Sequence, residues 1–184
     1  ICNVNAAAES LLQLSRRAMI DRPLSEVIYH DSPLFELIDR ADVPRLGALG
    51  ITASVQPPHP PGAMDFPMST MEQVFHRNRW KDAYLTKTLA DHDAPLAFAS
   101  DWPVTDVSVM RGIQSALTRV PFAGAGDERV GLVEVLRAYT AGGAYAGFAE
   151  GRFGSLGLGE RADFVVLSGD PLNTSADGLR AITV

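Results

Sequence analysis

Three side chains that can bind a metal or move a proton each follow a predicted strand. His30 ends the first strand, His59 lies three residues past the end of the second, and Asp101 directly follows the third. When parallel strands alternate with helices, the carboxyl ends of the strands meet at one face, so these side chains can share one mouth. A neutral imidazole and a carboxylate are ligands that Zn²⁺ takes, and a carboxylate beside a metal-bound water can act as its general base. The spacing is therefore compatible with a metal-assisted site.

Each of these residues also has an ordinary structural interpretation. A histidine at a strand end is often a hydrogen-bonded cap, and Asp101 suits an N-cap or a turn before Trp102 equally well. His59 lies among four prolines, where a surface or substrate-facing group is more common than a metal ligand. His76 and His92 fall in or near helical stretches and are interpreted as solvated surface residues. The HExxH, CxxC, GxSxG, P-loop and GxGxxG patterns are absent, which removes the commonest alternative chemistries.

The elements that must position these residues are short apolar strands alternating with helices. Strands are predicted over residues 26–30, 51–56 and 96–100, and helices over residues 5–20, 41–50, 80–91 and 107–119. This alternation is typical of an α/β fold with a parallel sheet and crossover helices. A proline-rich loop over residues 57–68 follows the second strand. Residues 57–74 suit either a substrate-specificity loop, lined by the apolar Phe66, Met68 and Met71, or a plain surface loop.

The last third of the chain changes character. One long helix is predicted over residues 132–148, followed by turn residues over 151–160. A strand is predicted over residues 162–168, and a further one over residues 180–184. We therefore expect two domains: βα units over residues 1–150 and a small β element over residues 151–184.

Composition limits the classes of function. The chain has 184 residues, of which 46% are hydrophobic, and its formal net charge is −6. An acidic chain without a basic cluster is a poor candidate for binding nucleic acid or anionic lipid, so a small neutral or cationic ligand is favoured. No apolar run is long enough to span a membrane. The single Cys2 cannot form an internal disulfide, which agrees with a reducing, cytoplasmic location.

Four strings in this order resemble the carboxyl-terminal part of the amidohydrolase superfamily. They extend over nearly the whole chain and cover residues 41–59, 97–104, 136–140 and 154–167. The most similar branch is amidohydrolase family 3, which includes the N-substituted formamide deformylases. The resemblance implies a metal-dependent hydrolase built as a (β/α)₈ TIM barrel, with a small β-sandwich formed by both chain ends. Residues 162–167 would be a returning strand of that sandwich.

The resemblance also assigns roles to individual residues. Asp101 matches the aspartate after strand eight, which binds the metal or activates its water, and His30 matches a metal-binding histidine after strand six. His59 matches the substrate-facing histidine of a Gln-Pro-x-His string after strand seven, and Trp102 is added as a substrate-binding candidate. Tyr29 departs from the family, which usually has an acidic residue there. The implied reaction is hydrolysis of a C–N bond, in an amide or N-formyl group, with one or two divalent ions, zinc in the first instance.

Several family residues have no counterpart in the sequence. The His-x-His after strand one, the bridging residue after strand four and the histidine after strand five are missing, so we expect a fragment that carries strands six to eight. Such a fragment is expected to be inactive alone and ordered only with the rest of the polypeptide or in a homo-oligomer. The alternative is a non-catalytic relic that serves as a binding or assembly module, in which Asp101 and His30 are structural caps.

Overall fold

The computed structural model describes residues 16–19, 43–63, 66–69 and 77–184. The chain divides into two compact units, Ile1–Asp42 and Val43–Val184. In the first unit the described residues form the short helix α2 (Arg16–Met19), which lies inside the predicted helix 5–20. The predicted strand 26–30, with its candidate ligand His30, lies outside the described residues.

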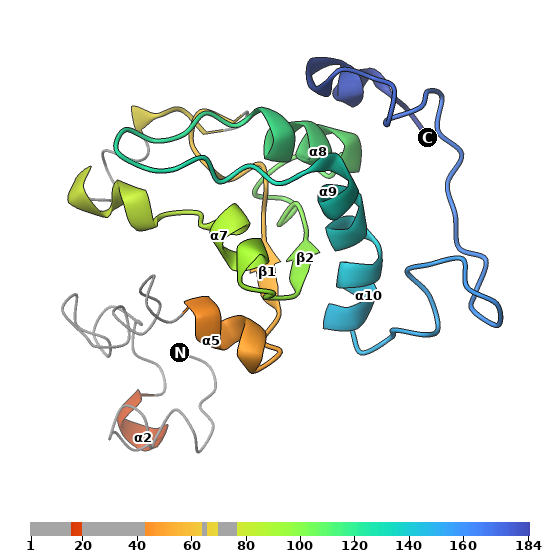
Figure 1. Cartoon of the computed structure of the whole chain (residues 1–184), viewed down its shortest axis with the longest axis horizontal. Helices are drawn as coiled ribbons and strands as arrows, with labels where there is room; N and C mark the ends of the chain where they lie inside the picture. The colour runs from red at the N-terminus through yellow and green to blue at the C-terminus, as the bar shows by residue number, and fades with distance from the viewer. Residues whose placement is uncertain (1–15, 20–42, 64–65, 70–76) are drawn as a thin grey trace. The chain divides into compact units, whose positions relative to one another are not determined.

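The second unit contains a parallel pair of strands, β1 (Ala53–Val55) and β2 (Leu96–Phe98) (Figure 1). Ala53 pairs with Leu96 and Val55 with Phe98, which confirms the predicted strands and their parallel arrangement. Both strands are shorter than predicted, although a hydrogen bond from the Ala99 amide to the Val55 carbonyl, at 3.1 Å, extends the ladder by one residue. The carboxyl ends of β1 and β2 therefore lie side by side.

Along the chain, the helices of the second unit are α5, η1, α7, α8, α9, α10 and η2. The amphipathic α8 begins after Ser108, whose hydroxyl accepts a hydrogen bond from the Arg111 amide at 3.3 Å. Among the described residues no helix has both the length and the apolar character needed to cross a membrane. The bounds are Val43–Ala48 (α5), Arg77–Asp82 (η1), Thr86–Asp91 (α7), Val109–Thr118 (α8), Leu132–Tyr139 (α9), Ala141–Ala146 (α10) and Ala176–Ala181 (η2).

The predicted single helix over residues 132–148 is wrong, because the structure has two helices there. Thr140, between α9 and α10, has φ −116° and ψ −89°, outside the helical region. Its hydroxyl donates a hydrogen bond to the Leu136 carbonyl at 2.8 Å, a local bond that competes with the regular helical ladder. The second helix ends at Ala146, and Phe148 then takes a positive φ of 54°.

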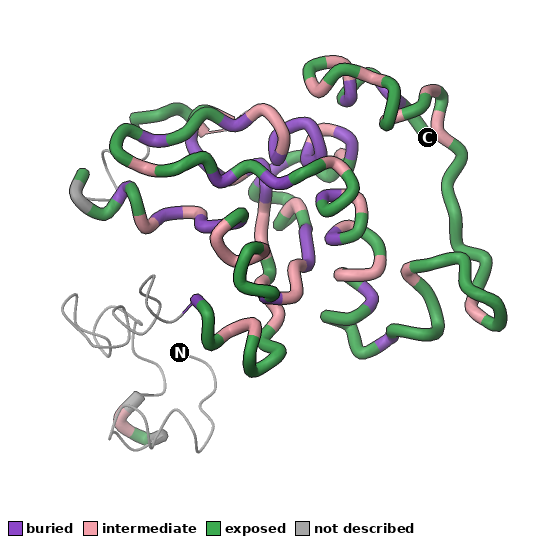
Figure 2. The backbone as a smooth tube through the Cα atoms, in the orientation of Figure 1, coloured by how far each residue is buried: buried purple, intermediate pink, exposed green. Residues whose placement is uncertain are grey.

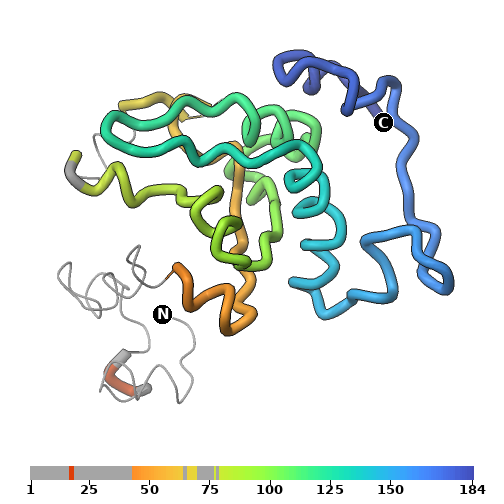
Figure 3. The backbone as a smooth tube through the Cα atoms, viewed as in Figure 1, coloured from red at the N-terminus to blue at the C-terminus, as the bar shows by residue number. Residues whose placement is uncertain are grey.

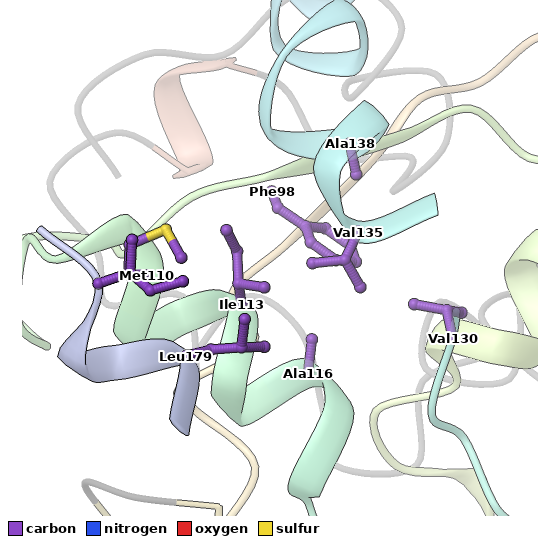
Figure 4. Close-up of a cluster of buried hydrophobic side chains, with 9 residues drawn as sticks. Phe98, Met110, Ile113, Ala116, Val130, Val135, Ala138 and Leu179 are labelled. Carbon is purple, nitrogen blue, oxygen red and sulfur yellow. The ribbon is translucent and has the colours of Figure 1, made fainter. Parts of the chain in front are cut away.

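The core of the second unit lies between β2, α8, α9 and η2. Figure 4 shows its side chains converging from these elements, with Ile113 of α8, Val135 of α9 and Leu179 of η2 almost completely buried. The Tyr139 ring packs edge-on against Phe98 at 5.5 Å, and burial raises the pKa of its hydroxyl. A smaller cluster is formed by Trp80, Ala83 and Phe122, with Tyr84 and Ala125 packed against it.

Neither predicted strand of the carboxyl-terminal segment is present. Residues 162–167 have no strand partner among the described residues, and the Ser168 amide donates one backbone hydrogen bond to the Thr183 carbonyl at 2.9 Å. Phe164, Val165 and Val166 are exposed. Figure 2 shows the stretch as a mostly exposed part of the chain, and its course can be followed in Figure 3. Residues 180–181 belong to the helical turn η2 instead. A strand is stable only when a neighbour takes up its backbone hydrogen bonds. The boundary between residues 150 and 151 stays a prediction.

Candidate functional site

The carboxyl ends of β1 and β2 bring two of the predicted site residues together. His59 follows β1 and Asp101 follows β2, and His59 Nε2 lies 3.7 Å from Asp101 Oδ2. The juxtaposition follows from the parallel register, because both loops leave the same edge of the sheet. The expectation that these two residues lie close together is therefore confirmed, and a shared barrel mouth stays a prediction. His30 lies outside the described residues.

A tight, proline-rich loop fixes the position of His59. The His59 amide donates to the Gln56 carbonyl at 3.0 Å, which closes a turn directly after β1. Four prolines around His59 are buried and restrict the backbone: Pro57, Pro58, Pro60 and Pro61. The Phe66 ring then meets the imidazole edge-on, with centroids 5.8 Å apart. His59 is consequently held with its side chain 20% exposed.

Asp101 occupies a short loop that leaves β2. Its φ of +57° lies in the left-handed region, which aspartate tolerates better than most residues. The Asp101 carbonyl accepts from the Val104 amide at 2.8 Å, and the Ser100 hydroxyl accepts from the Trp102 amide at 3.3 Å. The Thr105 hydroxyl donates to the Ser100 carbonyl. The Asp101 side chain is 54% exposed, so water reaches its carboxylate.

His59 and Asp101 together offer one nitrogen atom and one carboxylate group that can bind a ligand. His59 Nε2 is buried and has no hydrogen-bond partner in the described part of the chain, since at 3.7 Å the Asp101 carboxylate is too far away to supply one. An orphaned imidazole nitrogen beside a carboxylate suits a water, a substrate oxygen or a divalent cation. The described residues contain no cluster of three or more His, Cys, Asp or Glu that could hold a metal. His59 and Asp101 thus fit part of a metal site, whose other ligands must come from elsewhere.

Two further residues, Trp102 and Thr105, lie in the loop after β2, and only Trp102 is predicted from the sequence. Trp102, predicted to bind substrate, lies next to Asp101 with 67% of its surface exposed. Thr105 is 6% exposed and was not predicted to belong to the site. Its hydroxyl closes the loop by donating to the carbonyl of Ser100, five positions earlier. No periodic pattern in the sequence predicts such a loop closure. A serine or threonine shortly after a strand-end aspartate is the signal that could have suggested it.

A cavity elsewhere in the second unit is distinct from this pair. It has a volume of about 470 Å³ and runs along the start of β1 and the end of α10, with Thr52, Ser54, Tyr145 and Glu150 among its lining residues. Neither His59 nor Asp101 lines it. The chemistry of the candidate site therefore rests on the two strand-end loops and not on this cavity.

Comparison with known proteins places the chain in a family. The sequence pattern of the amidohydrolase family matches residues 3–184. The chain belongs to the amidohydrolase family. This amidohydrolase chain is 38% identical over 128 residues to the protein LONG AFTER FAR-RED 3 of Arabidopsis thaliana, covering 67% of this chain and 21% of that protein. It is 33% identical over 101 residues to the N-substituted formamide deformylase of Arthrobacter pascens, covering 53% of this chain and 19% of that protein.

A solved structure shows the same fold as this amidohydrolase chain. It is described as an uncharacterized metal-dependent hydrolase from Pyrococcus furiosus, and it superposes with a TM-score of 0.60 at 30% sequence identity. The match covers 72% of this chain and 26% of that one. The chain thus spans about a fifth to a quarter of the length of the relatives it matches.

Proposed function

We propose that this chain supplies His59 and Asp101 to the active site of a metal-dependent hydrolase that cleaves a C–N bond in a small amide or N-formyl substrate. The observation that carries the proposal is the 3.7 Å approach of His59 Nε2 to Asp101 Oδ2 at the carboxyl edge of a parallel sheet. Membership of the amidohydrolase family supports hydrolysis, and one relative is named for deformylation of N-substituted formamides.

In the proposed mechanism the two side chains have different tasks. The exposed Asp101 carboxylate orients the attacking water and accepts its proton. His59 Nε2, which has no hydrogen-bond partner among the described residues, donates a hydrogen bond to the substrate carbonyl oxygen, where negative charge develops. The exposed Trp102 ring, adjacent in sequence to Asp101, contacts the apolar part of the substrate.

A divalent cation, zinc in this proposal, completes the site. Asp101 and His30 would hold it, together with ligands from outside this set, as one ion or a pair of ions. When bound, such a cation lowers the pKa of water enough for attack at neutral pH and polarises a carbonyl group. The two side chains assigned to the ion, a carboxylate and an imidazole, are of the kind that zinc takes in proteins. A metal-dependent hydrolase of the same fold supports a bound metal ion, and zinc and its ligands are part of the proposal.

Removal of the metal is expected to abolish hydrolysis. The protein as it is made in the cell would be treated with a chelator, assayed against a panel of N-formyl and N-acyl amines, and assayed again after zinc is restored. We expect turnover of at least one substrate class, its loss on chelation and its recovery with zinc. The free amines and carboxylates of the same panel are the matched controls. A complete lack of turnover in the zinc-loaded protein would favour the non-catalytic binding or assembly module instead.

We further propose that these two strands are part of a (β/α)₈ barrel and that residues 151–184 contribute to a small β-sandwich. We also propose that the protein works in the cytoplasm without nucleic-acid or membrane partners. In the part of the chain that the structure describes, β1 and β2 each have one strand neighbour. Open strand edges and exposed apolar residues such as Phe164 and Val166 favour association with further chain or a second copy.

Light scattering on a polypeptide of these 184 residues checks the association directly. We expect a molar mass that is a multiple of 19.8 kDa, or binding to a separately produced amino-terminal part. Charge substitutions at Phe164 and Val166 serve as the comparison, because they remove the exposed apolar surface without touching the core. A stable monomer that does not bind the amino-terminal part contradicts the proposal.

A further inference from the structure

We infer that Thr105 is a positioning residue for Asp101, whose hydroxyl holds the peptide bond between Ser100 and Asp101 and so keeps the carboxylate facing His59. The inference rests on the proposed function, in which Asp101 orients water and holds the metal. Nothing in the proposed mechanism requires Thr105 to touch substrate. Its effect is on the direction in which another side chain points.

The first step of the argument is the backbone conformation of Asp101. Its φ of +57° is in the left-handed region, which is unfavourable for most residues that have a Cβ. Such a conformation persists only where neighbouring contacts impose it, and it is common at functional sites. The φ angle sets the direction of the Cα–Cβ bond relative to β2. A relaxed Asp101 backbone would therefore turn the carboxylate away from His59.

The second step is the set of contacts that impose this conformation. Two hydrogen bonds involve the exposed residues Trp102 and Val104, whose amides donate at 3.3 and 2.8 Å. The third comes from Thr105, which is 6% exposed and spans the whole loop to reach the Ser100 carbonyl. That carbonyl belongs to the peptide group whose nitrogen is the Asp101 amide. Thr105 is thus the buried anchor of the peptide plane on which φ of Asp101 depends.

A second threonine provides a matched control. The Thr118 hydroxyl also donates to a backbone carbonyl, that of Gln114, at 2.9 Å. This bond lies within α8, where the backbone is already held by the helical ladder. Replacing either threonine by valine removes one hydroxyl and preserves the β-branched shape. Only the Thr105 substitution is expected to affect the site.

The test compares Thr105→Val, Thr105→Ser, Thr118→Val and Asp101→Asn in the protein as it is made in the cell. Bound zinc is measured by elemental analysis after equilibration at fixed free zinc, and kcat and KM are measured on the best substrate. For Thr105→Val we expect kcat to fall by about 10²-fold with KM unchanged, as for a misplaced reacting group. We also expect less bound zinc at an unchanged unfolding temperature. Thr105→Ser and Thr118→Val should behave as wild type.

Each remaining outcome decides between the inference and the proposed function. If Asp101→Asn keeps both zinc and turnover, the proposed function has failed, whatever Thr105 does. If Asp101→Asn loses them and Thr105→Val keeps them, only the inference is wrong. A Thr105→Val protein that does not fold is replaced by Thr105→Ala, which deletes the same hydroxyl. If neither folds, Thr105 is a structural residue and the positioning role is rejected.

Discussion

Replacing Asp101 by asparagine is expected to lower kcat/KM by about 10²- to 10⁴-fold, the range attributed to a general base. Asparagine has the shape of aspartate and tolerates the φ of +57° that Asp101 adopts, so the loop should persist. It carries no negative charge and cannot accept a proton from water. The unfolding temperature should therefore remain that of the wild type, because the side chain is 54% exposed. Steady-state kinetics and thermal unfolding measure the two effects.

Asp93 is a closely matched control for this experiment. It is an exposed aspartate with a φ of 59°, nearly the same backbone conformation as Asp101, but it precedes β2 instead of following it. Asp93→Asn should leave both activity and stability unchanged. An Asp101→Asn protein with wild-type turnover would contradict the catalytic role. A protein inactive from the outset, in which Asp101→Asn lowers only stability, would support the structural alternative.

A large effect on stability is expected at Gly142 in α10. A Cβ at this position would overlap the Leu96 carbonyl oxygen, because α10 packs directly onto the start of β2. The obstacle is backbone and not the end of a flexible side chain, so the helix must move away from the sheet. We expect Gly142→Ala to lower the free energy of unfolding by about 1–3 kcal/mol, as overpacking does. Denaturant unfolding measures the difference.

The adjacent Gly143 gives the opposite expectation. A Cβ there would meet no atom within 4 Å, and the residue is exposed. Alanine favours a helix over glycine by about 0.5–1 kcal/mol, so Gly143→Ala should stabilise the protein. Opposite signs for two neighbouring glycines would show that the cost at Gly142 comes from its contact with β2. Equal effects at both positions would show that α10 does not pack on β2 as described.

The sequence correctly predicted those strands and helices in which apolar residues recur with the period of the element itself. β1, β2 and α8 each present apolar residues at the spacing of a strand or a helix, and the helix α8 also has its cap at Ser108. The break at Thr140 had no such signal, because it depends on the local hydroxyl bond and on the approach of α10 to β2. Residues 162–168 show the reverse case, in which a strand-like pattern forms no strand in the described part of the chain and makes one backbone hydrogen bond, from Ser168 to Thr183.

The site was predictable where it follows from topology. Parallel strands bring their carboxyl ends together, so a histidine after β1 and an aspartate after β2 had to meet at one edge. The contacts that orient these residues, the Phe66 ring against His59 and the Thr105 hydroxyl on Ser100, depend on how two irregular loops close. Loop closure follows no repeating pattern of residues, so these orienting contacts could not be predicted from the sequence.

The position of Leu179 and Ile182 affects the way in which this unit can be made. Both side chains are buried in the core with residues of β2, α8 and α9, although they lie far along the chain from those elements. Proteins fold during synthesis as their segments leave the ribosome. The core around Ile113 therefore cannot be completed until residue 182 has emerged, and nascent chains stalled before η2 should present this apolar surface to chaperones.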